Sequence, residues 1–217
     1  LTNAGAGTGG VLINSSIDSD VTGIVQNSAT SLLTLSGFTS LAGGLTIPPG
    51  EVLVTTANSA MGTGPLTLGD PSGSATTPAT LTVGTTGLTF ANPIVLGGSS
   101  GPLTIQNANI AATTFSGGVT GSNNLNVVNS AGGANAITFS TNPLNNSGNV
   151  TFSGGSTGTV TVSGGVGTNV KQLTLAGISP VTISTTAVNV NATGTTLAAT
   201  GTGLFTISAA TQGTGNL

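Results

Sequence analysis

The sequence predicts an all-β chain wound into a single parallel β-helix, or β-solenoid, of roughly eight coils. Three features of the 217 residues predict this: an apolar–Thr–apolar tripeptide recurs throughout, strand-forming residues stand in short runs, and Gly, Asn, Ser and Pro separate the runs. Because strand side chains alternate between faces, each tripeptide places two apolar side chains on one face and a hydroxyl on the other. Many short strands of one pattern indicate a chain wound around one long core.

Twelve of the expected strands centre on these tripeptides. When the other short runs between Thr34 and Thr206 are included, the central residues lie roughly ten positions apart on average, as expected of many short strands in a repeat architecture. With two or three strands per coil, about eight coils stacked ~4.8 Å apart form a rod of roughly 40 Å. The expected strands contain residues 33–35, 45–47, 66–68, 81–83, 88–90, 103–105, 137–139, 150–152, 160–162, 173–175, 181–183 and 205–207.

A β-sandwich or barrel would have a similar strand spacing. The solenoid is favoured because the runs are shorter than the usual five or six residues. The Asn-Gly and Asp-Gly hairpin signals are also absent, although the chain has 36 glycines. Strong helix formers are scarce, and the one expected helical turn is a short one around Ala57–Met61.

We expect residues 1–217 to form one β-solenoid domain without an internal boundary. Gly-rich segments near residues 1–10 and 211–217 are expected to join the solenoid to its surroundings. The stretch 69–78, which contains Asp70-Pro71-Ser72-Gly73, is the best candidate for a loop that projects from the rod.

Charged residues make up only 2% of the chain, and the sequence has no Arg, His, Cys, Trp or Tyr. Disorder is disfavoured because 36% of the residues are hydrophobic and the mean hydropathy is +0.39. The net charge of −3 offers no basic patch, so neither nucleic acid nor an anionic membrane surface is an expected partner. No apolar run approaches the roughly 18 residues of a membrane-spanning helix, and membrane insertion is not expected.

Residues 31–70 resemble the autotransporter-associated β-strand repeat of bacterial surface and secreted proteins. The matching motifs are Leu33-Thr34-Leu35-Ser36-Gly37, Gly43-Gly44, Thr46-Ile47 with Gly50, and Ala60-Met61-Gly62-Thr63-Gly64 before Leu66-Thr67-Leu68. The family's usual Asn-Thr-Tyr is Thr39-Ser40-Leu41 here, and Pro48-Pro49 and Glu51 replace small or polar residues. The resemblance implies a right-handed parallel β-helix that is exported to the cell surface or outside the cell. It carries no catalytic residues.

The chain offers few residues for chemistry. Asp18 and Asp20 stand where a calcium loop would place oxygen ligands, which makes them a weak calcium candidate, although the twelfth position is Ala29 rather than Glu. Paired-carboxylate catalysis would need Glu51 and Asp70 to lie beside these two residues. A Ser–Lys nucleophile would have to use Lys171, because no His is present. We therefore expect no enzymatic activity and no cofactor.

The leading hypothesis is a structural protein of the bacterial cell surface or extracellular matrix. Open strand edges at the two ends of a solenoid favour head-to-tail association of the chain with itself, which produces fibres for adhesion or a biofilm scaffold. The alternative is a monomeric autotransporter-type stalk. Such a stalk would bind glycan, a host surface or ice through its Thr-rich face.

Overall fold

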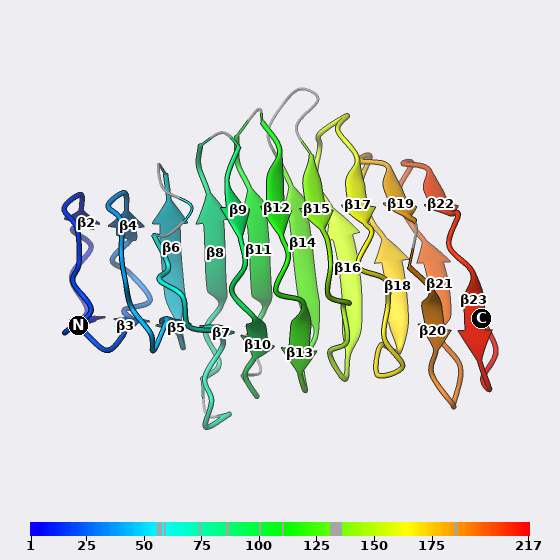
Figure 1. Cartoon of the computed structure of the whole chain (residues 1–217), viewed down its shortest axis with the longest axis horizontal. Coiled ribbons are helices and arrows are strands. Elements are labelled where there is room, and N and C mark those ends of the chain that lie inside the picture. Colours follow the sequence, from blue (N-terminus) through cyan, green and yellow to red (C-terminus); the bar gives the residue numbers. More distant parts are fainter. Residues whose placement is uncertain are drawn as a thin grey trace.

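The computed structural model describes residues 1–55, 58, 60–73, 75–85, 87–99, 101–109, 111–130, 136–184 and 186–217. They form a β-solenoid of about eight turns, with the two termini at opposite ends of the stack (Figure 1). The expected all-β solenoid is confirmed, and no helix occurs in the part of the chain that is described. Of the helical turn expected around Ala57–Met61, Ala57 and Ser59 lie outside the described residues.

The rod contains three parallel sheets. In the central part of the rod, each full turn of the chain contributes to all three sheets. Sheet I contains β1 (Thr2–Ala4), β3 (Ile24–Asn27), β5 (Leu45–Ile47), β7 (Leu66–Leu68), β10 (Ile94–Leu96) and β13 (Val119–Gly121), and bridges at Leu144 and Val166 lead on to β20 (Val188–Val190) and β23 (Thr211–Gly213). Sheet II contains β2 (Val11–Ile13), β4 (Leu33–Leu35), β6 (Gly50–Val54), β8 (Ala79–Val83), β11 (Leu103–Asn107), β14 (Leu125–Asn129), β16 (Asn149–Ser153), β18 (Gln172–Leu175) and β21 (Thr196–Ala199). Sheet III contains β9 (Thr89–Phe90), β12 (Thr113–Phe115), β15 (Ile137–Phe139), β17 (Val160–Val162), β19 (Val181–Ile183) and β22 (Phe205–Ile207).

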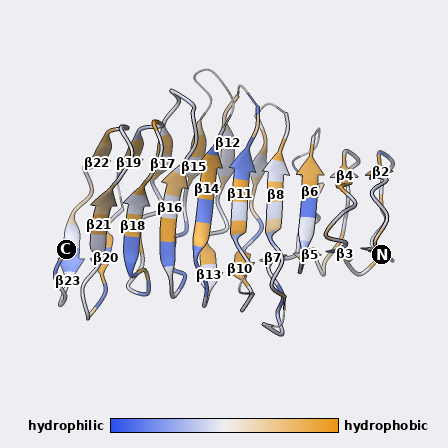
Figure 2. Cartoon of the chain, turned by 180° about the vertical axis from the view of Figure 1, so that it is seen from behind, coloured by the Kyte–Doolittle hydropathy of each residue, from blue (hydrophilic) through white to orange (hydrophobic). Residues whose placement is uncertain are grey.

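The alternation of apolar and polar residues determines which side chains enter the core. In β4, β5 and β7 the outer two residues are buried and the central threonine is only half-buried. Figure 2 shows the same alternation of hydrophobic and hydrophilic residues along β11 and β14. Each strand therefore presents one face to the core and the other to solvent.

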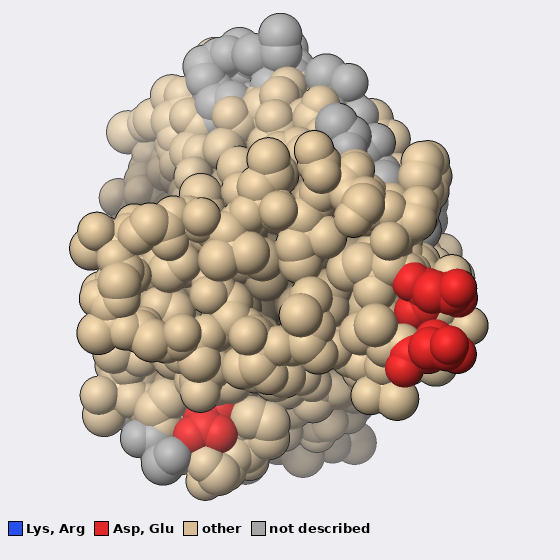
Figure 3. Space-filling view, turned by 90° about the vertical axis from the view of Figure 1, so that its left-hand side faces the viewer, with Lys and Arg blue, Asp and Glu red and all other residues tan. Residues whose placement is uncertain are grey.

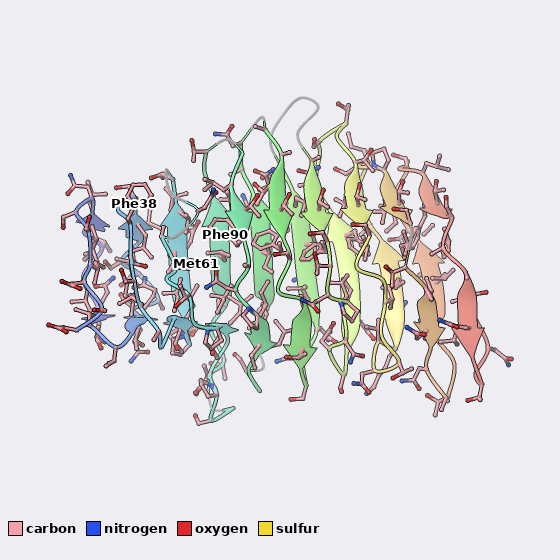
Figure 4. All side chains as sticks on the ribbon, viewed as in Figure 1. Phe38, Met61 and Phe90 are labelled. Atoms are coloured by element: carbon pink, nitrogen blue, oxygen red, sulfur yellow. The ribbon has the colours of Figure 1, made fainter. Side chains whose placement is uncertain are left out.

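Phenylalanine side chains stack through the middle of the core. Phe115 is 1% exposed, and its ring centroid lies 5.5 Å from those of Phe90 and Phe139 in the adjacent coils. Met61 and Phe90, both 0% exposed, lie between the sheets, whereas Phe38 is 69% exposed (Figure 4). The core is thus a continuous column of apolar side chains along the rod.

Asparagine side chains bind successive coils together at the turns. Asn92 is 4% exposed, and its Nδ2 donates to the carbonyl oxygens of Gly62 at 3.0 Å and Gly64 at 2.6 Å. A tight turn leaves these carbonyl groups without strand partners, and a buried carbonyl without a hydrogen bond destabilises the fold. The asparagine side chain supplies the missing donors.

Glycine is required where a turn passes directly over the preceding coil. Gly154 has φ of +116°, and a Cβ atom at this position would overlap the backbone oxygen of Asn129. Only a residue without a side chain combines this backbone conformation with so close an approach.

The two segments expected to join the solenoid to its surroundings each contain a strand. β1 pairs with β3, and β23 pairs with β20. Strand pairing with the neighbouring coil incorporates these residues into the stack, although both segments are rich in glycine. Between β7 and β8 the chain extends beyond the other turns of that corner (Figure 1), and Pro71, Ser72 and Gly73 are exposed there.

Candidate functional site

The N-terminal end of the rod exposes the solenoid core. A hollow of about 480 Å³ opens there, and Val11, which lines it, is 38% exposed. Acidic side chains are confined to the margin of this end face in Figure 3. The apolar residues that line the hollow are Leu1, Val11, Ile13, Ile17, Val21, Ile24 and Leu33.

The strand edge beside this hollow has unpaired backbone groups. In β2, the amide of Val11 donates to Leu32 O at 2.8 Å, and the carbonyl oxygen of Ile13 accepts from the Ser36 amide at 2.9 Å. Because successive residues of a strand direct their peptide groups to opposite sides, the N–H and C=O of Leu12 face away from β4. This outer edge has the geometry that accepts another parallel strand.

The C-terminal end presents the opposite edge of sheets I and II, together with the last strand of sheet III. Here the amide of Thr196 donates to Lys171 O at 2.9 Å, so β21 uses its inner edge to pair with β18. Leu197 is 37% exposed, and Phe205 and Ile207 are half-buried although they pack against the core. Both ends therefore combine an unpaired strand edge with partly uncovered apolar side chains.

The calcium candidates lie in a polar turn near the N-terminal end. Asp18 Oδ1 accepts from the Ser19 amide at 2.6 Å and the Ser19 hydroxyl at 3.0 Å, and Asp18 O accepts from the Val21 amide at 3.1 Å. Asp20 is exposed in the same turn. Within the described ranges, no group of three or more His, Cys, Asp or Glu residues is arranged to hold a metal ion.

The other charged residues lie on separate parts of the rod. Glu51 is on β6, where its Oε1 accepts from the Thr82 hydroxyl at 2.6 Å. Asp70 is in the projecting turn after β7 and accepts from the amide of Ser72 at 2.9 Å. Lys171 is exposed just before β18. The structure does not assemble these residues with Asp18 and Asp20 into one site.

Two polar surfaces lie on the sides of the rod. The sequence predicted a Thr-rich face but not which residues share it, because neighbouring residues there come from different coils. The first is a shallow hollow of about 500 Å³ on sheet I beside the projecting turn, lined by Thr67, Pro71, Val95, Thr120, Asn145 and Asn169 among others. The second lies on sheet III, where one threonine from each strand lies directly above the next. We call this set the Thr column; it consists of Thr89, Thr114, Thr138, Thr161, Thr182 and Thr206.

Comparisons with known proteins give no relative from which a function could be transferred. No protein-family model, curated protein or solved structure matches the chain. A search of the described residues for a helix that is long and apolar enough to cross a membrane also found none. The surfaces described above are therefore the basis for a functional proposal.

Proposed function

We propose that this chain is a non-catalytic structural protein of the bacterial cell surface or extracellular matrix. In this proposal the rods associate end to end into filaments that support adhesion or a biofilm scaffold. The observation that carries the proposal is the pair of open ends, each with unpaired strand edges and partly uncovered core residues.

Backbone pairing and apolar burial both favour this contact. Sheets I and II present an edge at both ends of the rod, so stacking can continue the parallel ladders of these two sheets from one copy into the other. The contact would also cover Val11, Ile13 and Ile17 at one end and Phe205 and Ile207 at the other. A head-to-tail contact that does not close into a ring produces an open filament.

The nearly neutral surface supports the same proposal. The chain has four acidic residues and one basic residue, so long-range repulsion between copies is weak. Proteins with little net charge associate more readily than highly charged ones.

The proposal is tested by blocking the N-terminal edge with Leu12→Pro. The side chain of Leu12 is 62% exposed and its amide faces the open edge, so proline removes one outward donor while the bonds between β2 and β4 remain. The matched control is Leu12→Thr, which removes the same side chain but keeps the amide. Filament length by negative-stain electron microscopy and mass by sedimentation velocity are the measurements.

We expect filaments from the 217-residue chain and from Leu12→Thr, and shorter particles or monomers from Leu12→Pro. A wild-type chain that stays monomeric and fibre-free at high concentration would contradict the proposal. Filaments of equal length from all three proteins would show that contact does not occur through this edge.

A further inference from the structure

The outer face of sheet III carries a second row of hydroxyl groups beside the Thr column. Two residues after each of the last five threonines stands a serine, and we call this set the Ser column: Ser116, Ser140, Ser163, Ser184 and Ser208. The Ser140 amide donates to Phe115 O at 2.8 Å, and the other four serines make the equivalent bond to the preceding coil at 2.8–3.1 Å. The parallel ladder therefore holds both columns in register.

This register makes a regular two-dimensional array of hydroxyl groups. Adjacent rungs are separated by the spacing of parallel strands, ~4.8 Å, and the two columns by two strand residues, ~6.6 Å. The array has five complete rungs, because Ala91 follows Thr89 in place of serine. Sheet II has no equivalent array, since its outward column Glu51–Thr80–Thr104–Asn126–Thr151–Thr174 mixes carboxylate, hydroxyl and amide groups.

The hydroxyl groups of the Thr column are available to water. Those of Thr114, Thr138, Thr161, Thr182 and Thr206 make no hydrogen bond to any residue that the structure describes. These five side chains are half-buried, and all except Thr206 lie between two neighbours in the column, which restricts their motion. β-Branching restricts the χ1 angle of threonine further.

The dimensions of the array approach those of ordered water. In a tetrahedral network with O···O distances of about 2.75 Å, second-neighbour oxygens lie about 4.5 Å apart and the layers repeat about every 7.3 Å. Both spacings agree with those of the array to within about 10%. When the hydroxyl array and the water lattice are aligned at the middle rung, the difference in spacing displaces the end rungs by only about 0.6 Å.

The surrounding chemistry favours a water lattice over a sugar surface. The aromatic side chains of β9, β12 and β15 point into the core and are at most 1% exposed, so they offer no stacking platform to a sugar ring. All five charged residues lie outside the strands of sheet III. The exposed groups of the two columns are therefore neutral hydroxyls and methyls.

We propose that the outer face of sheet III, formed by the Thr column and the Ser column, binds the surface of ice. The hydroxyl groups hold a layer of water at nearly the spacing of the crystal, and this layer joins the growing lattice. The face lies on the side of the rod, so the proposal does not depend on the end-to-end association proposed above.

The experiment measures thermal hysteresis and the incorporation of fluorescently labelled protein into a single ice crystal. The label is attached through Lys171→Cys in every protein, because the chain has no other cysteine and this position precedes a strand of sheet II, away from the proposed face. The double variant Thr138→Lys/Thr161→Lys inserts two long charged side chains on adjacent rungs of the array. Its matched control, Thr151→Lys/Thr174→Lys, makes the same change at two adjacent half-buried threonines of sheet II.

We expect the wild-type chain and the sheet II variant to enter ice and to show hysteresis, and the sheet III variant to lose both. Circular dichroism establishes that each protein is folded. If the sheet III lysine variant does not fold, Thr138→Val/Thr161→Val removes only the hydroxyl groups, and it is expected to reduce hysteresis.

Three outcomes would overturn the proposal. The first is a folded wild-type chain that is excluded from ice and shows no hysteresis. The second is an equal loss of hysteresis and of incorporation into ice in the sheet II and sheet III variants, which would show that ice binding does not depend on this array. The third is retention of the wild-type chain by insoluble cellulose or chitin but not by ice, which would assign the face to a polysaccharide. Filament formation after Leu12→Pro gives the separate result for the proposed function.

Discussion

Replacing Phe115 by alanine is expected to destabilise the centre of the rod more than any exposed substitution. The side chain is 1% exposed and lies 5.5 Å from a phenylalanine ring on each side. Truncating a buried phenylalanine to alanine costs about 3–5 kcal/mol of unfolding free energy. Each aromatic contact contributes about 0.5–1.5 kcal/mol beyond burial alone, so we expect a loss of about 5 kcal/mol. Phe115→Leu, which retains much of the volume, is expected to cost about 1.5 kcal/mol.

Urea unfolding followed by far-ultraviolet circular dichroism measures this effect, because the chain has no Trp or Tyr to serve as a fluorescence probe. The Leu12→Pro background removes any contribution from end-to-end contacts. Since each coil contacts only its neighbours, loss of a central contact can divide the transition into two. A separate early transition in Phe115→Ala would place the weakened region in the coils of β9, β12 and β15.

Phe38→Ala is the matched control, because the same substitution is made where the side chain is 69% exposed. We expect it to change the unfolding free energy by less than about 0.5 kcal/mol. If Phe115→Ala and Phe38→Ala differ by less than about 1 kcal/mol, the stacked phenylalanines do not stabilise the core as argued.

Three further substitutions or conditions test the turns and the electrostatics. Gly154→Ala is expected to lower the unfolding free energy by more than about 1 kcal/mol, because the backbone has φ of +116° and a Cβ atom would meet Asn129 O. The control is Gly155→Ala, where no atom lies within 4 Å of the added Cβ. This variant is expected to be neutral or stabilising in the same urea titration. Asn92→Ala leaves two turn carbonyls without their donors at 3.0 and 2.6 Å, and a loss of about 1–3 kcal/mol is expected; an unchanged melting curve would disprove the role of this side chain. Sodium chloride up to about 0.5 M is expected to change the unfolding free energy by less than about 1 kcal/mol, because only five side chains are charged; a strong salt dependence measured by circular dichroism would contradict this.

The local pattern was sufficient to locate about half of the strands. Eleven of the twelve tripeptides lie wholly in strands, and the remaining one lies in β9 except for Leu88, because apolar–Thr–apolar favours a half-buried strand in any coil. Among the residues that the structure describes, eleven further strands, including β10 (Ile-Val-Leu), β13 (Val-Thr-Gly) and β21 (Thr-Leu-Ala-Ala), do not have this pattern. Their conformation depends on pairing with adjacent coils, a contact that short-range propensity does not describe.

The candidate surfaces were less accessible to sequence reasoning than the fold. Asp18 and Asp20 were selected as oxygen ligands from their spacing, and the structure places them in a local turn with Asp18 bonded to Ser19. The recurring threonine was identified as an outward residue, and its neighbours in space were unknown. The two open ends were expected from the solenoid class, whereas their exposed side chains were not.

The sequence alone determined that this chain forms short strands around an apolar core and carries almost no charge, since both properties follow from residue type and local alternation. The tertiary structure decided which residues share a column. Coil length varies from 19 residues between Leu33 and its partner Val52 to 29 between Gly50 and Ala79, so no constant period relates one coil to the next. Only the pairing of strands across these unequal turns aligns Thr114, Thr138 and Thr161 on one face, because backbone hydrogen bonds between coils, and not chain distance, set the register.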